Sequence, residues 1–137
     1  MSALLLDTCA AIWLAEGEAI ADEAMAAIDR AASASETILV SPITAWEVGL
    51  LAARGRIAMS VPPQTWFERL LAVPGIALAD LSVRVLIASS YLPGTPPRDP
   101  ADRMIAATAR ENGLKLITRD SLLLGYAKQG HIEALAC

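Results

Sequence analysis

Short apolar runs alternate with longer helix-forming segments along most of this chain, and this alternation restricts the possible folds more than any other feature. The runs are mainly apolar, three or four residues long, and fall at 3–6, 37–40, 76–79 and 115–117. Such short continuous runs are typical of strands buried on both faces of a parallel sheet. Because helical segments separate them, we expect an α/β domain with a mostly parallel sheet.

Residues that favour helix ends mark the limits of the helical segments. Ser41 precedes Pro42, which fits a hydroxyl N-cap followed by proline at the first helical position. Asp99 precedes Pro100 in the same way, and Gly113 fits the left-handed residue that ends a helix. We expect helices at 8–14, 18–34, 42–53, 63–72, 82–90 and 100–112, a helical turn from Asp120, and an edge strand near 131–135.

Composition excludes several classes of protein. A hydrophobic content of 55% in 137 residues is enough for one core, so we expect residues 1–137 to form a single domain. No uncharged apolar run reaches the ~18–20 residues of a membrane span. No basic segment precedes the first apolar run as in a signal peptide, so we expect a cytoplasmic protein. Two cysteines and one histidine are too few for a disulfide framework or a zinc site.

The net charge of −4 argues against a passive nucleic-acid coat, but the charge is unevenly distributed. Residues 1–50 contain one basic and eight acidic residues, whereas residues 51–137 contain ten basic and seven acidic ones. Nine of the eleven basic residues are arginines, whose forked guanidinium suits contacts with phosphate. The net charge of the whole chain is therefore negative although residues 51–137 carry a net positive charge.

Two aspartates follow predicted strands. Asp7 comes directly after the run 3–6, and Asp120 comes after 115–117, with Thr118 before it. Ligands of open parallel sheets bind beyond the carboxyl ends of the strands, so we expect both carboxylates in one crevice. Each aspartate is equally compatible with a plain N-cap of the helix that follows it.

Glu47 lies in an otherwise apolar helical segment. At about 100° per residue, it shares a face with Ile43, Trp46, Leu50 and Leu51. We interpret this face as the buried one. A carboxylate there must be paired, protonated or bound to a cation, because an isolated buried charge is very costly. The alternative to a bound cation is an ion pair with an arginine, for which Arg54 and Arg103 are the candidates.

The sequence Asp99-Pro100-Ala101-Asp102 opens another predicted helix. Asp99 fits the N-cap and Asp102 the third helical position, close to a capping box. Asp102 also shares a helical face with Ile105, so we expect it on the core side. We therefore assign Asp99 to the cap and the surroundings of the site, and Asp102 to the site itself.

Four carboxylates, those of Asp7, Glu47, Asp102 and Asp120, are thus expected to face inward without a fixed cationic partner. Such a cluster is stable only with bound cations or shifted pKa values. Carboxylates without cysteine or histidine select hard ions, Mg²⁺ or Mn²⁺. One or two such ions can activate a water and hold a phosphate, so the cluster indicates phosphodiester hydrolysis.

The segments that carry these acids resemble one family when they are taken together. They are Leu4-Leu-Leu-Asp7-Thr8, the segment from Ser41 to Arg56, the segment from Arg98 to Ala109, and Leu116-Ile-Thr118-Arg-Asp120. In this order they resemble PIN-domain ribonucleases, and more narrowly the VapC-type toxins of bacterial toxin–antitoxin pairs. The resemblance implies one PIN domain over residues 1–137, with a three-layer α/β/α fold around a short, mostly parallel central sheet.

The resemblance also implies roles for individual residues. Asp7, Glu47, Asp102 and Asp120 match the acidic quartet that holds Mg²⁺ or Mn²⁺ and carries catalysis. Thr118 matches a hydroxyl that orients the last acid or a water. The chain departs from many relatives because Pro97 and Arg98 stand where a histidine is common, and Ala101 where phenylalanine is common.

Partners follow from the same resemblance. It implies an RNA substrate, a homodimer, and a cognate antitoxin that covers the acidic crevice, with a higher toxin–antitoxin assembly as an extension. Arg98, Arg103 and Arg119 flank the acid-bearing segments. They are equally compatible with a solvated, charge-balancing shell and with contacts to RNA phosphates.

The sequence therefore predicts a metal-dependent endoribonuclease, the toxin of a type II toxin–antitoxin pair, which leaves a 5′-phosphate and a 3′-hydroxyl. The alternative is a catalytically silent PIN-like module that binds protein or RNA, which the intact quartet disfavours. A receiver-like signalling domain is disfavoured because the late strand ends in Thr118-Arg119-Asp120 rather than at a lysine.

Overall fold

The computed structural model describes residues 3–137 and contains one five-stranded sheet. The strands are β1 (Leu4–Leu6), β2 (Ile38–Val40), β3 (Ile76–Leu78), β4 (Lys115–Thr118) and β5 (Glu133–Ala136). The helices are α1 (Thr8–Glu16), α2 (Asp22–Ser33), α3 (Pro42–Ala53), α4 (Pro63–Ala72), α5 (Val83–Ala88), α6 (Pro100–Asn112) and α7 (Ser121–Lys128). The alternation predicted from the apolar runs is confirmed, and the predicted edge strand is present.

The strand order is β3-β2-β1-β4-β5, and each neighbouring pair is parallel. Leu5 in β1 lies opposite Leu39 in β2 on one side and Leu116 in β4 on the other. β1 is therefore the centre of the sheet, from which the chain builds outward first through β2 and β3 and then through β4 and β5. The carboxyl ends of all five strands lie along the same edge.

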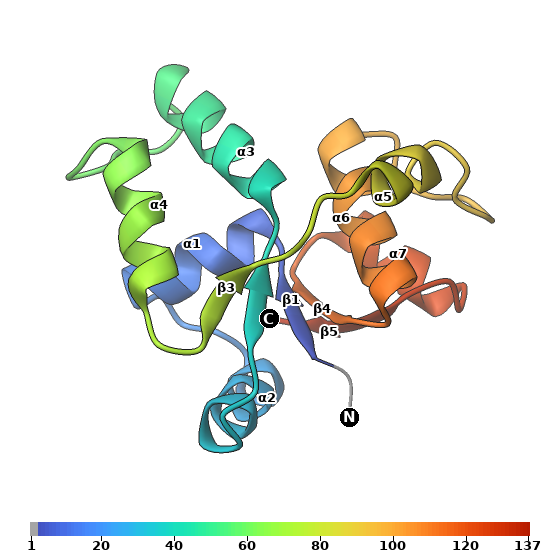
Figure 1. Cartoon of the computed structure of the whole chain (residues 1–137), viewed down its shortest axis with the longest axis horizontal. Coiled ribbons are helices and arrows are strands. Elements are labelled where there is room, and N and C mark those ends of the chain that lie inside the picture. The colour runs from blue at the N-terminus through green and yellow to red at the C-terminus, as the bar shows by residue number, and fades with distance from the viewer. Residues whose placement is uncertain (1–2) are drawn as a thin grey trace.

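Alternate residues of the central strand point to opposite faces of the sheet, as strand geometry requires. Leu4 and Leu6 belong to a core cluster that includes residues of α1, α2 and α4, whereas Leu5 belongs to a second cluster with α6 and α7. Figure 1 shows α1 and α4 on one side of the sheet and α6 and α7 on the other. The three-layer α/β/α architecture is thus confirmed.

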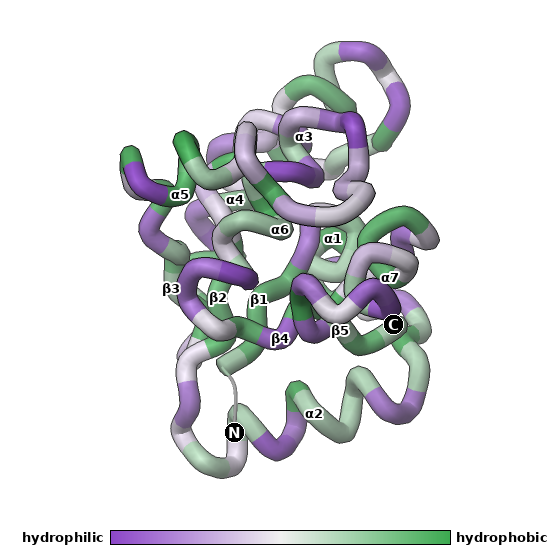
Figure 2. Tube along the Cα trace, turned by 90° about the vertical axis from the view of Figure 1, so that its right-hand side faces the viewer, coloured by the Kyte–Doolittle hydropathy of each residue, from purple (hydrophilic) through white to green (hydrophobic). Residues whose placement is uncertain are grey.

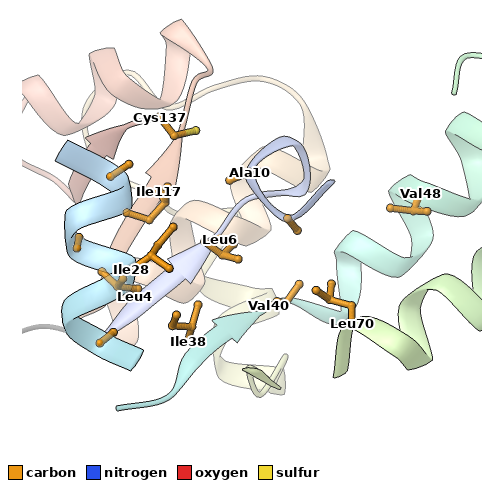
Figure 3. Packing of buried hydrophobic residues seen from close by; sticks show 14 of the residues in the cluster. Leu4, Leu6, Ala10, Ile28, Ile38, Val40, Val48, Leu70, Ile117 and Cys137 are labelled. Carbon is orange, nitrogen blue, oxygen red and sulfur yellow. The ribbon is translucent and has the colours of Figure 1, made fainter. Parts of the chain in front are cut away.

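The first of these clusters is drawn in Figure 3. Leu4, Leu6 and Ile38 gather there next to Ile28 from α2. The tube in Figure 2 is hydrophobic along β1, which carries no polar residue and is buried at every position. Burial on both faces explains why β1 appears in the sequence as a continuous apolar run rather than an alternating one. The edge strands β3 and β5 are only partly buried. Within residues 3–137, no helix is long and apolar enough to cross a membrane.

Candidate metal centre

The edge formed by the strand ends positions two of the predicted acids. Asp7 follows β1, and its backbone N–H donates to the carbonyl of Ile117 in β4, 3.1 Å away. Its Oδ1 atom accepts a hydrogen bond from the Ala10 N–H at 2.7 Å, which caps α1. Asp120 follows β4 and caps α7 in the same way. Both aspartates are therefore caps, and they also stand at the edge where parallel sheets bind ligands.

Thr118 connects these two aspartates. It is fully buried at the end of β4. Its hydroxyl donates to the Oδ2 atom of Asp7 and accepts from the backbone N–H of Asp120 at 3.0 Å. Thr118 thus holds the carboxylate of Asp7 in place and the backbone, not the carboxylate, of Asp120. Its expected orienting role stays a prediction, and the contacts that serve such a role are present.

Glu47 is held by a threonine pair that the sequence reasoning did not identify. Thr8, in the first turn of α1, donates to the Oε1 atom of Glu47 at 2.5 Å. The same hydroxyl lies 3.1 Å from the hydroxyl of buried Thr44 on α3. Because Thr8 has one proton and gives it to the carboxylate, it accepts from Thr44. The signals in the sequence are a hydroxyl residue directly after Asp7 and another, Thr44, on the helical segment that carries Glu47.

The predicted buried face of α3 is wrong. Trp46 is 58% exposed, and the buried residues of α3 are Thr44 and Val48. The helix is apolar on most sides, so helical periodicity alone does not select the face that packs. Glu47 is nevertheless half-buried, between the buried residues and solvent. Neither Arg54 nor Arg103 pairs with it, because the one ion pair within residues 3–137 joins Arg84 and Glu111.

Three carboxylates converge beside this edge of the sheet. Glu47, Asp99 and Asp102 each place one carboxylate oxygen within 4.8 Å of the other two. Asp99 caps α6 by accepting from the N–H of Asp102 at 3.0 Å, as expected. The structure also brings Asp99 into the group itself rather than leaving it in the surroundings. Asp7 and Asp120 lie outside this triplet.

Burial and mutual repulsion act on these acids. Burial raises the pKa of Asp102 from its ordinary 3.8 to about 7, with Asp99 as the next cause and Asp120, Glu47 and Asp7 adding to it. Burial also raises the pKa of Asp7 and of Glu47, against the hydrogen bonds from Thr118 and Thr8 respectively. Each ionised carboxylate therefore disfavours the ionisation of its neighbours, and a bound cation would relieve this repulsion.

Cys9, on the first turn of α1, lies near the same negatively charged carboxylates. Partial burial of its thiol, followed by the charges of Asp7 and Glu47, raises the pKa of that thiol to about 11. Cys9 is not among the three residues whose ligand atoms converge. The remaining donors are carboxylate oxygens, and such a set suits the hard ions Mg²⁺ and Mn²⁺. The residues present thus fit the ion that the resemblance implies.

The three predicted RNA-binding arginines differ in their contacts. Arg103 donates to the carbonyls of Ser89 at 2.8 Å and Pro97 at 3.2 Å, so it fastens α6 to the two ends of the loop that precedes it. Arg119 donates to the carbonyl of Cys137 at 2.6 Å and stacks 3.6 Å above the ring of Trp13. Within residues 3–137, the side chain of Arg98 makes neither a hydrogen bond nor an ion pair. Arg98 is therefore the one free to contact a ligand.

Comparison with known proteins places this chain in a family. Residues 4–129 match the model of the PIN domain. The chain belongs to the PIN-domain family. It is 33% identical over 127 residues to Ribonuclease VapC22 of Mycobacterium tuberculosis, an alignment that covers 92% of this chain and 93% of that relative. Its place among the VapC-type members of the family, predicted from the four motifs, is thereby confirmed.

Solved structures show the same fold at lower identity. VapBC2 from Rickettsia felis, bound to a DNA fragment of its promoter, aligns with a TM-score of 0.68 at 14% identity and covers 97% of both chains. DNA-bound VapBC from Salmonella typhimurium aligns with a TM-score of 0.66 at 20% identity, over 99% of this chain and 98% of that one. Both confirm the α/β/α architecture.

Proposed function

We propose that this chain is a metal-dependent endoribonuclease that acts as the toxin of a type II toxin–antitoxin pair. The observation that carries the proposal is the triplet of Glu47, Asp99 and Asp102, which has no cationic partner within residues 3–137 and lies at the carboxyl edge of a PIN-family sheet. The ribonuclease named among the relatives supports an activity on RNA.

Glu47, Asp99 and Asp102 would hold the ion, with Asp7 and Asp120 beside them. Bound there, Mg²⁺ or Mn²⁺ supplies activation of water and stabilises negative charge on a phosphodiester. The inclusion of Asp99 extends the predicted quartet of catalytic and metal-binding acids, which is Asp7, Glu47, Asp102 and Asp120. The proposal therefore treats these five acids as one group.

The surrounding residues prepare this group for its ligand. Thr118 holds Asp7 and Thr8 holds Glu47, so two carboxylates are oriented before any ion arrives. Both threonines are buried and β-branched, which limits their rotamers and keeps these hydrogen bonds in one geometry. Pre-orientation of this kind lowers the entropic cost of binding an ion and a phosphate.

An antitoxin and a second copy of this chain are the proposed protein partners. The solved VapBC structures support an antitoxin partner because they are toxin–antitoxin complexes. A homodimer is supported by large apolar side chains that are exposed on and just after α5. Val83 is 72% exposed, Ile87 59% and Tyr91 81%. Exposed apolar residues gathered on one element are typical of protein interfaces.

Cleavage of RNA by the purified chain tests the proposal. Wild-type protein with Mg²⁺ or Mn²⁺ should cut RNA and leave 5′-phosphate ends, and chelation with EDTA should abolish cutting. Asp102→Asn should lower the rate at least about a hundredfold, because a carboxylate that holds the ion is lost. Cleavage that persists in EDTA, or in the Asp102→Asn variant, would contradict metal-dependent catalysis at this site.

Expression in a bacterial host separates a toxin from a silent binding module. The wild-type chain should arrest growth when it is expressed alone, and the Asp102→Asn variant should not. Wild-type protein that folds, binds RNA or an antitoxin, and neither cuts RNA nor arrests growth would favour the silent module instead.

A further inference from the structure

A hollow of about 410 Å³ lies next to the candidate metal centre. One wall is the segment 95–99, and the other is the exposed side of α7. Asp99 lines this hollow and also belongs to the triplet of converging carboxylates. The hollow therefore adjoins, at Asp99, the place where the proposed ion and the scissile phosphate would bind.

Side-chain hydrogen bonds from α7 and its C-cap hold the loop that forms the first wall. The hydroxyl of buried Tyr126 donates to the carbonyl of Pro93 at 2.6 Å. The side-chain oxygen of Gln129 accepts from the N–H of Thr95 at 2.9 Å. A loop held at two points is ready to receive a ligand, because less of its entropy remains to be lost on binding.

The lining combines flat apolar surfaces with unused polar groups. Pro96, Pro97 and Leu122 supply apolar area, and Leu122 is 63% exposed. Within residues 3–137, neither the guanidinium of Arg98 nor the hydroxyl of Ser121 has a hydrogen-bond partner. One cation, one hydroxyl and apolar walls match the chemistry of a nucleotide, which has an apolar ring face, polar ring edges and an anionic phosphate.

We propose that this hollow binds one unstacked base of the RNA next to the scissile phosphate. The base lies against Pro96 and Leu122, Ser121 donates to or accepts from its edge, and Arg98 contacts the adjoining phosphate. Single-stranded RNA is commonly read through splayed bases in this way, and the volume suits a small ligand. The inference rests on the proposed function, because it assigns the base to the substrate of that site.

Gly125 allows the hollow to be filled without removing any contact. It lies in α7 and lines the hollow, and a Cβ added there meets nothing within 4 Å. Leucine is also a better helix former than glycine, so Gly125→Leu should not weaken α7. Gly49→Leu is the matched control, because Gly49 lies in α3, has the same open space, and does not line the hollow. Gly125→Ala provides a smaller change if the leucine variant fails to fold.

Binding is measured by fluorescence anisotropy of a short single-stranded RNA in EDTA, so that no cleavage occurs. Gly125→Leu should weaken binding by at least about tenfold relative to Gly49→Leu, which is the range expected for losing one bound base. A second series replaces each base of the RNA in turn by an abasic residue. One abasic position should weaken binding to wild type and have no further effect on Gly125→Leu, because both changes remove the same contact.

The possible outcomes separate this inference from the proposed function. Additive effects of Gly125→Leu and of every abasic position would overturn the inference, as would equal RNA binding by the two leucine variants. Loss of antitoxin binding with unchanged RNA binding in Gly125→Leu would assign the hollow to the antitoxin and overturn it as well. If wild type binds RNA through the hollow but never cuts it with Mg²⁺ or Mn²⁺, the base site stands and the proposed cleavage fails.

Discussion

Replacing Asp102 by asparagine should stabilise the metal-free protein at pH 8 by about 1–2 kcal/mol. Burial, with Asp99 close by, raises the pKa of Asp102 to about 7, so the folded state disfavours its charged form. Asparagine is nearly the same size and carries no charge. The substitution therefore removes a repulsion that opposes folding whenever no cation is bound.

The magnitude follows from the pKa and from the position of the side chain. A rise from 3.8 to about 7 corresponds to a loss of at most about 4 kcal/mol in the free energy of unfolding. Asp102 is only half-buried, so water screens part of this repulsion. Its place in the first turn of α6 also stabilises a negative charge by about 0.3–1 kcal/mol, which the variant loses.

The pH dependence gives the sign of the effect. Below about pH 3.8 this carboxyl is protonated in both the folded and the unfolded chain, so wild type and Asp102→Asn should differ little. Between pH 3.8 and about 7 the unfolded carboxyl is ionised while the folded one stays protonated, and wild type loses stability relative to the variant. Above about pH 7 the difference is complete.

Urea unfolding in EDTA from pH 4 to pH 8 measures this difference, with Asp29→Asn on the exposed side of α2 as the control. Added Mn²⁺ should then reverse the order of stability. At a hundred times its dissociation constant an ion stabilises wild type by about 2.7 kcal/mol, and the variant should gain less. A variant that is less stable than wild type at pH 8 in EDTA, or a stability difference that does not change with pH, would show that the charge of Asp102 does not oppose folding.

Three further predictions concern side chains around the site. Thr118→Val should lower the free energy of unfolding by about 1–3 kcal/mol, because Asp7 loses a buried donor; Thr118→Ser should recover most of it in the same urea titration. Arg103→Met should cost about 1–3 kcal/mol, because two backbone carbonyls lose their charged donor, and an unchanged urea midpoint would contradict that structural role. Arg98→Gln should change stability by less than about 0.5 kcal/mol, yet it should weaken RNA binding and reduce the slope of log affinity against log salt by about one; an unchanged slope would show that Arg98 contacts no phosphate.

Most of the fold was predictable because local patterns and tertiary packing agree. The central strand β1 and its neighbours β2 and β4 are largely buried, so they appear as short apolar runs. Their shortness and the helix-start signals that follow them distinguish these runs from helices. The helix starts at Ser41 and Asp99 were predictable because capping depends on neighbouring residues. The buried face of α3 was not predictable, because Trp46, Leu50 and Leu51 offer an apolar stripe as good as the one that packs.

In the candidate site, too, some features could be predicted from the sequence and others could not. Asp7 and Asp120 could be placed at one edge from the sequence, because each lies within two residues of a strand end and parallel strands end together. The entry of Asp99 into the acidic triplet could not be predicted, because the direction of its carboxylate depends on how α6 packs beside α3. The contacts of Arg103 and Arg119 were equally hidden, since both donate to carbonyls distant in the sequence.

The strand-forming runs, the capped starts of α3 and α6, and the acids that follow strands could all be identified from the sequence, because these properties depend on neighbours along the chain. The expected helix over 18–34 begins only at Asp22, where no side chain caps it. The convergence of the carboxylates, the threonines that hold them, and the freedom of Arg98 among the three predicted RNA-binding arginines emerge only from the folded chain. Hydrogen bonds and electrostatic repulsion act over a few ångströms in space, and sequence separation does not give that distance. Residues as distant in sequence as Thr8 and Glu47 meet only after the layers have packed.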